Sequence, residues 1–210
     1  MTEKYTSVAG ETQTEKIIEK SRFITTSRRV ESEAAAKEFI TEISKKYSDA
    51  THNCYAYICD RLGNFLRFSD DGEPQGTAGM PILEVIKSKR LSEVAVVVTR
   101  YFGGIKLGAG GLLRAYSGCV AENLDVAKKV VFETCSEIKI TVDYPLTDAA
   151  TRFISESSAA LLNTEYLNEV IFTVAVRRTE EGEFLSALKS RLNGKVRYEK
   201  LKEYFFPFET

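Results

Sequence analysis

The chain lacks several residue patterns that would assign a function directly. It contains one histidine, His52, and its four cysteines match no zinc-binding or redox spacing (Cys54, Cys59, Cys119 and Cys135). A histidine-rich metal site is therefore excluded, and a lone imidazole at the start of a strand is more often structural than catalytic. We expect free, mostly buried thiols in a reducing cytoplasm.

Long apolar runs and an excess of one charge are also missing. No run approaches the roughly 20 residues of a membrane span, and the N-terminal segment has no apolar signal-peptide core. The formal net charge is −1, with near balance in both halves of the chain. We therefore expect a cytoplasmic protein without a membrane partner that does not read DNA sequence, although a local basic patch remains compatible with this composition.

What the chain does contain predicts an α+β fold. The first thirty residues are rich in β-branched and aromatic residues, which favours strands. Ser32 is a suitable N-cap for a helix with an apolar stripe, and the alternating segment HNCYAY predicts a strand. Further helices are expected from about Pro81 and from about residues 109–111.

The pattern changes after about Thr134. The order of elements becomes β-α-β-β-α-β, with the first helix expected over residues 146–162. This order is that of the ferredoxin-like split βαβ unit. We therefore predict two domains, residues 1–134 and residues 135–210.

Glycine is concentrated in one region, since ten of the thirteen glycines fall between Gly63 and Gly118. The segment RYFGGIKLGAGGLLRAY, residues 100–116, joins a strand to a helix, so free amides and the helix dipole could bind a phosphate. The P-loop and dinucleotide patterns are matched only in part. Positive φ angles and close packing are the commoner use of such glycines, and this role and a phosphate site can hold together. The phosphate- or nucleic-acid-binding hypothesis names Arg100, Tyr101, Gly103, Gly104, Lys106, Gly108, Gly110, Gly111 and Arg114.

Two other clusters have both a functional and a structural interpretation. Asp70, Asp71 and Glu73 could hold Mg²⁺ through their hard oxygen atoms, or they could be solvated turn residues. Aromatic residues alternate with arginines, most clearly at Arg100-Tyr101-Phe102, and such pairs can stack on bases. The alternative is that the aromatic rings belong to the core and the arginines to its solvated rim.

The two glycine-containing segments resemble the signature segments of the IMPACT family, also called the YigZ family. They are SDDGEPQGTAGMP, residues 69–81, and VTRYFGGIKLGAGGLLRAY, residues 98–116, and the segments SRF and HNCYAY fit the same pattern. The further motif residues are Arg22, Phe23, His52, Pro74, Gly76, Thr77 and Tyr116. The β-α-β-β-α-β tail resembles the small C-terminal domain of bacterial members.

The resemblance implies a first domain with the fold of the second domain of ribosomal protein S5, and a tail like the last domain of elongation factor G. It therefore implies contact with RNA or the ribosome by analogy of fold. Eukaryotic members restrain a translational kinase through its activator, but we expect this chain to lack their additional N-terminal module. Some bacterial members carry a proline-dipeptidase label, which the single histidine argues against.

The leading hypothesis is a non-enzymatic cytoplasmic protein linked to translation, which binds RNA, the ribosome or a translation-associated protein. An Mg²⁺-dependent nucleotide- or phosphate-binding enzyme that uses the same glycine turn is the alternative. A third hypothesis is a protein-interaction module in which the glycine turn is purely structural.

Overall fold

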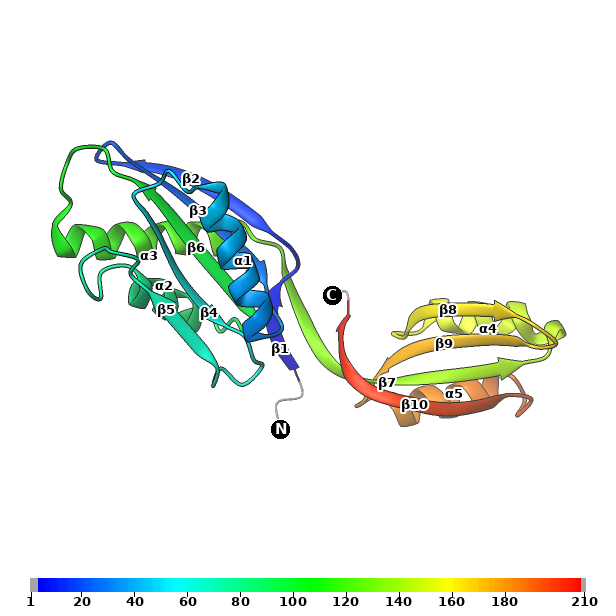
Figure 1. The fold of residues 1–210 in the computed structure, drawn as a ribbon. Coiled ribbons are helices and arrows are strands. Elements are labelled where there is room, and N and C mark those ends of the chain that lie inside the picture. The colour runs from blue at the N-terminus through cyan, green and yellow to red at the C-terminus, as the bar shows by residue number, and fades with distance from the viewer. Residues whose placement is uncertain (1–3, 209–210) are drawn as a thin grey trace. The chain divides into compact units, whose positions relative to one another are not determined.

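The computed structural model describes residues 4–208, and these divide into two compact units. The first comprises Lys4–Val130, and the second runs from Val131 to the end of the described residues. The boundary expected near residue 134 falls within β7 (Lys129–Val142), the strand that carries the chain from one unit to the next (Figure 1). Each unit has its own antiparallel sheet and its own apolar core.

The sheet of the first unit has the strand order β2-β3-β6-β4-β5. The strands are β2 (Thr12–Ile18), β3 (Ser21–Arg29), β4 (His52–Ile58), β5 (Leu66–Ser69) and β6 (Val94–Tyr101), and every neighbouring pair is antiparallel. A further strand, β1 (Lys4–Val8), pairs with β7 and also meets the loop after α2 through a bridge between Thr6 and Leu91. The long apolar run in β6 is explained by its central position, because helices cover both of its faces.

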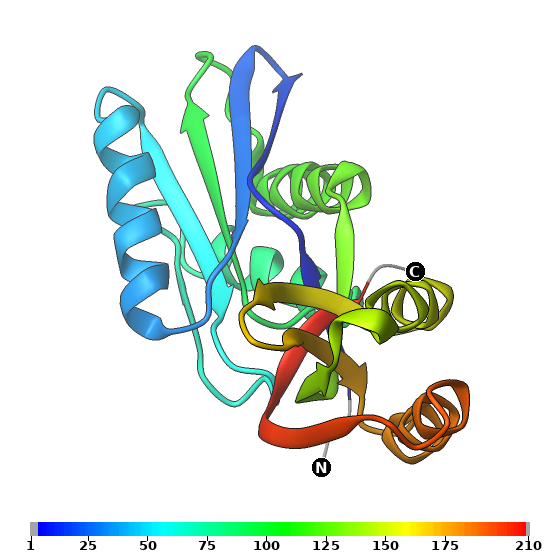
Figure 2. The same cartoon turned by 90° about the vertical axis from the view of Figure 1, so that its right-hand side faces the viewer.

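Three helices cover the two faces of this sheet. One face packs against α1 (Glu33–Lys46), and the other packs against α2 (Gly79–Ser88) and α3 (Gly108–Val126). Figure 2 shows α1 in blue and α3 in green on opposite sides of the sheet. The Ser32 cap is confirmed, since its hydroxyl accepts from the amide of Ala35. The alternation in β4 is also confirmed, with Cys54, Ala56 and Ile58 facing α2 and α3.

The second unit has the predicted order β-α-β-β-α-β. Its elements are β7, the short 3₁₀ turn η1 (Tyr144–Leu146), α4 (Thr147–Glu156), β8 (Ala160–Tyr166), β9 (Val170–Arg177), α5 (Glu181–Arg191) and β10 (Arg197–Phe208). The strand order β10-β7-β9-β8 leaves one strand between the two ends of each βαβ crossover, as a split βαβ unit requires. The α+β prediction is therefore correct for both units.

One predicted helix is too long. Residues 160–162 were expected to continue α4, but they belong to β8. The serines after Glu156 explain the early end, because the Ser157 hydroxyl donates to the carbonyl of Ile154 and accepts from the amide of Ala159. A serine that bonds the local backbone in this way competes with continued helix.

All four cysteines are free and buried, as expected. None of the helices within residues 4–208 is long and apolar enough to cross a membrane.

Candidate functional site

A buried ion pair lies where the motif segments meet. Arg100, at the end of β6, donates from Nη1 to Glu73 Oε1 at 2.6 Å, and the two side chains are 5% and 3% exposed. Arg100 also donates from Nη2 to the hydroxyl of Ser21 at 3.2 Å. The Tyr116 hydroxyl, on α3, donates to the same Glu73 oxygen at 2.8 Å. The Glu73 carboxylate therefore joins the loop before α2 to β6 and α3 directly, and to β3 through Arg100.

The antiparallel registers bring these residues together. Arg100 pairs with Phe23 on β3 and with His52 on β4, so all three lie side by side in the sheet. Phe23 and Tyr116 pack edge to face with centroids 5.5 Å apart. The loop between β5 and α2 then supplies Glu73 to the same face. This cluster is a structural centre whose charges compensate each other away from water.

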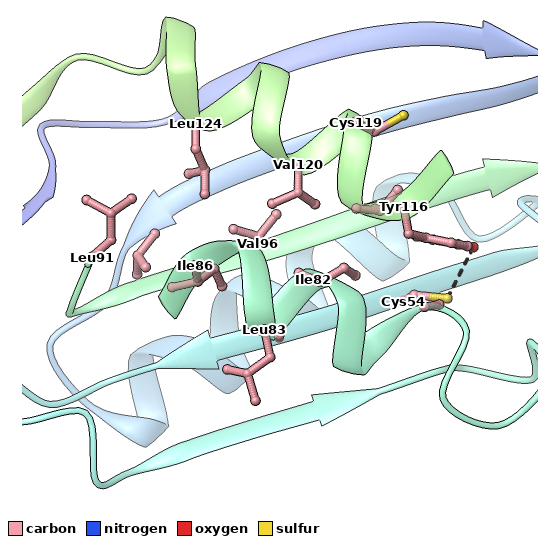
Figure 3. Packing of buried hydrophobic residues seen from close by; sticks show 14 of the residues in the cluster. Cys54, Ile82, Leu83, Ile86, Leu91, Val96, Tyr116, Cys119, Val120 and Leu124 are labelled. Carbon is pink, nitrogen blue, oxygen red and sulfur yellow. Dashed lines mark hydrogen bonds between the residues drawn. The ribbon is translucent and has the colours of Figure 1, made fainter. Parts of the chain in front are cut away.

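Cys54 and His52 flank the ion pair without forming a catalytic pair. The Cys54 thiol donates to the carbonyl of Asp70 at 2.9 Å and lies 3.3 Å from the Tyr116 hydroxyl (Figure 3). Burial raises the pKa of Cys54 to about 12, so the thiol stays protonated and unreactive near neutral pH. Burial also raises the pKa of Tyr116 well above its usual range.

The imidazole of His52 is held by the loop before α2. Its Nδ1 lies 2.7 Å from the carbonyl of Asp71, which can only accept, so this nitrogen donates. Its Nε2 lies 3.9 Å from Glu73 Oε2, which is too long for a hydrogen bond. His52 therefore anchors the acidic loop to β4, which agrees with the structural interpretation of a lone histidine.

The three acids of this loop each have a different partner. Asp70 accepts from the amides of Gly76, Ala78 and Gly79 and so stabilises the start of α2. Burial alone would raise the pKa of Asp70, but these three amides outweigh it and hold the pKa below its usual value.

Asp71 accepts from the amide of Asn53 at 2.6 Å, and Glu73 belongs to the ion pair. Over residues 4–208, no three histidine, cysteine or acidic side chains gather as metal ligands. The Mg²⁺ prediction therefore gains no support from the geometry.

The remaining motif residues of the loop shape its turn. The Thr77 hydroxyl donates to the carbonyl of Pro74 at 2.6 Å, and Gly76 has a φ of +76°. These contacts place the amides that Asp70 binds. Pro74, Gly76 and Thr77 are therefore explained by local structure.

The glycines after β6 fall into two kinds. Gly103 has a packing role, because an added Cβ would lie 2.0 Å from the carbonyl carbon of Lys20. Gly108, at the start of α3, has a φ of +69° that disfavours other residues. Gly104 also has a positive φ, and a Cβ on Gly111 would press on Leu107 at 3.0 Å. Close packing and unusual φ angles therefore account for most of this glycine-rich turn.

Gly110 is different, because neither demand applies to it. A Cβ there would meet only the flexible end of Arg114, at 3.7 Å. The turn at Gly110 is exposed, at the beginning of a helix whose N-cap, Leu107, provides no side-chain hydrogen bond. No acidic residue occupies the first turn of α3, whereas α1 has both a serine cap and Glu33.

The predicted basic residues separate into buried and exposed members. Arg100 is buried, so it is not available to a ligand. Tyr101 lies on the opposite face of the sheet, where its hydroxyl donates to Asp49, and the exposed Arg22 pairs with Glu15. Lys106 and Arg114 are exposed beside the start of α3, and no acidic partner is found for either within residues 4–208.

Sequence reasoning missed the partnership between Glu73 and Arg100. The two residues are 27 positions apart along the chain, one in a loop and the other in a strand. The available signal was the two-residue period of a strand, which places Arg100 on the same face as the buried residues Val96 and Val98. A charged residue at such a position needs a buried partner. Ser21, which binds both Arg100 and the amide of Gly103, was also missed.

These features describe a class of protein, namely a two-unit α+β protein whose first unit is organised around a buried ion pair beneath a glycine-rich turn. Residues 19–124 match the Impact N-terminal domain, and residues 140–195 match a domain of unknown function (DUF1949). The chain is 41% identical to IMPACT family member YvyE of Bacillus subtilis, covering 93% of this chain and 90% of that protein. It is 32% identical to IMPACT family member YigZ of Escherichia coli, covering 89% and 92%. The chain therefore belongs to the IMPACT family.

Two further comparisons extend this result. A crystal structure of a hypothetical protein matches 96% of this chain and 99% of that chain, with a TM-score of 0.63 and 30% identity. Protein IMPACT of Oryctolagus cuniculus is 46% identical over 68 residues, which is 31% of this chain but only 21% of that protein. The similarity to the bacterial relatives thus extends over both units, whereas that to the rabbit protein is confined to a short segment.

Proposed function

We propose that this protein binds RNA in the cytoplasm, in the context of translation, through the surface at the start of α3. The single observation that supports this proposal is that two cationic side chains without an acidic partner, Lys106 and Arg114, lie at the uncapped N-terminus of α3 within residues 4–208. Lys106 and Arg114 are exposed beside the first amides of α3, which no side chain caps within residues 4–208. Phosphate groups fit such a surface because the helix dipole and both cations attract negative charge.

The buried ion pair supports this surface from beneath. Glu73 neutralises Arg100, and Ser21 links Arg100 to the amide of Gly103. The turn is thereby fixed before any ligand arrives, which lowers the entropy cost of binding. Gly110 leaves bare backbone at the exposed position, so a phosphate can approach the amides closely.

The test is binding to ribosomes and to free RNA at low and moderate salt, for the wild type and for Lys106→Ala/Arg114→Ala. Both substitutions are at exposed positions, so folding should be retained. A matched control is Lys37→Ala/Lys45→Ala on α1, which removes the same charge on the opposite face of the sheet. We expect weaker binding only for the first variant.

Salt dependence separates phosphate contacts from other effects. Each lost phosphate contact reduces the slope of log affinity against log salt by about 0.7 for a single strand, so two should reduce it by about 1.4. Equal loss in both variants would contradict the assigned surface. If the wild type binds neither ribosomes nor RNA, the proposal fails, and a protein partner becomes the next hypothesis to test. The groove of about 310 Å³ between α2 and α3, lined by Met80, Val85 and Leu113, is where that search would begin.

A further inference from the structure

Phe102 is an exposed aromatic residue on a rigid backbone. It directly follows β6, and 46% of its surface is exposed to solvent. Its amide donates to the hydroxyl of Thr51 at 3.0 Å. The next residue, Gly103, donates to Ser21 and packs against the carbonyl of Lys20. The ring is therefore displayed from a segment that is tied to two neighbouring parts of the first unit.

The ring is also supported from behind by a fixed cation. The Arg100 guanidinium carbon lies 5.4 Å from the centroid of Phe102 and 5.4 Å from that of the buried Phe23. Glu73 and Ser21 hold this guanidinium in place. The Nε of Arg100 has no hydrogen-bond partner within residues 4–208. The guanidinium is therefore held by its Nη hydrogen bonds and by the rings of Phe23 and Phe102. Of the two rings that Arg100 contacts, Phe23 is buried and Phe102 is exposed.

We propose that Phe102 is a stacking platform for an unpaired RNA base, whose backbone phosphates contact Lys106 and the start of α3. This inference rests on the proposed function and narrows its ligand to single-stranded RNA. Aromatic rings bind bases through their π faces, and these faces are available in a single strand but are already stacked in a duplex. Lys106 follows Phe102 by four residues in the same turn. A rigid ring next to free cations is the combination that single-strand binding proteins use.

The absence of tryptophan from the chain provides a direct readout. Phe102→Trp introduces the only tryptophan of the sequence at the platform, which can be excited apart from the ten tyrosines, and stacking of a base on its ring should quench its fluorescence. The probe is a single-stranded RNA of about 12 nucleotides, within the usual site sizes, compared with the same sequence as a blunt duplex. Phe65→Trp is the matched control, because Phe65 is 68% exposed in the turn before β5. We expect quenching by the single strand at position 102 only.

A second variant measures the energetic contribution. Phe102→Leu keeps an apolar side chain but removes the planar ring, and we expect the affinity for single-stranded RNA to fall about 5- to 150-fold, as for one lost stacked base. The salt slope should not change, because no phosphate contact is lost. The affinity for the duplex should stay near that of the wild type.

The outcomes distinguish this inference from the function on which it rests. The stacking platform would be overturned if RNA did not quench the fluorescence of Phe102→Trp and if Phe102→Leu kept the wild-type affinity. Weaker binding by Lys106→Ala/Arg114→Ala in the same experiments would leave the RNA-binding surface intact. Equal quenching by single strand and duplex would also overturn it. Absence of any RNA binding by the wild type would overturn both.

Discussion

Breaking the ion pair between Arg100 and Glu73 should destabilise the first unit strongly. Arg100→Met leaves the Glu73 carboxylate buried with Tyr116 as its remaining close partner, and Glu73→Gln leaves a buried guanidinium without a counter-charge. Because the two side chains are only 5% and 3% exposed, water cannot replace the lost partner. Removing one member of a buried pair costs about 3–5 kcal/mol. That is a large part of the total of about 5–15 kcal/mol that stabilises a domain.

The double variant Arg100→Met/Glu73→Gln should cost no more than the worse single variant. It leaves no buried charge, and the glutamine oxygen can still accept from Tyr116. The two single costs therefore should not add, and the double-mutant cycle should give a coupling free energy of about 3 kcal/mol or more.

The assay is urea unfolding of the full chain, followed by circular dichroism and by hydrogen exchange in peptides from β6. The exchange signal assigns the loss to the first unit. Arg22→Met is the matched control, because Arg22 pairs with Glu15 at the surface, where a pair contributes about 0–1 kcal/mol. A cost for Arg100→Met that equals that of Arg22→Met, or additive costs in the cycle, would refute the reasoning.

Three further predictions concern single positions. Asp70→Asn should cost about 0.5–1.5 kcal/mol near neutral pH for each hydrogen bond lost, because asparagine has one accepting oxygen where the carboxylate uses two. Because the folded pKa of Asp70 lies below the ordinary 3.8, this stabilisation is present above that pH and lost as pH falls below it, so wild type and variant should converge in acid unfolding curves. Gly103→Ala should lower the free energy of unfolding in urea by about 3 kcal/mol or more, because the added Cβ would overlap the backbone of Lys20. A free energy of unfolding equal to that of the wild type would contradict this packing. Gly118→Ala should raise the free energy of unfolding by about 0.5–1 kcal/mol in the same assay, because Gly118 lies inside α3 and an added Cβ would meet no neighbouring atom. A lower free energy of unfolding would show that a methyl group does not fit there.

Local sequence patterns predicted most of the secondary structure. Ser32 identified the start of α1, because a serine hydroxyl satisfies a free helix amide. The alternation in HNCYAY indicated which side chains of β4 are buried, because neighbouring residues of a strand point to opposite faces. The long motif segments indicated the family, which the comparisons confirm. Such signals depend on residues that are near one another in the chain.

The candidate site was predicted less completely. Its location at the glycine-rich turn, with Lys106 and Arg114, remains a prediction from sequence that the exposure of both side chains supports. The two-residue period of a strand places Arg100 and Tyr101 on opposite faces of the sheet, but the sequence could not tell that the face of Arg100 is closed to water. That outcome depends on which helices cover which face, and α1 and α3 are far apart in the sequence.

The elements, the family and the position of the unusual backbone could therefore be predicted from the chain alone. The roles of the charged residues, in contrast, depended on the tertiary structure. Glu73 is an ion-pair partner because the loop before α2 brings it to the face of the sheet where Arg100 lies, and both side chains are closed to water there. Phe102 is exposed because the turn ends its strand just beyond that pair. A charge acquires its role from distance and burial, and both arise only when remote segments pack together.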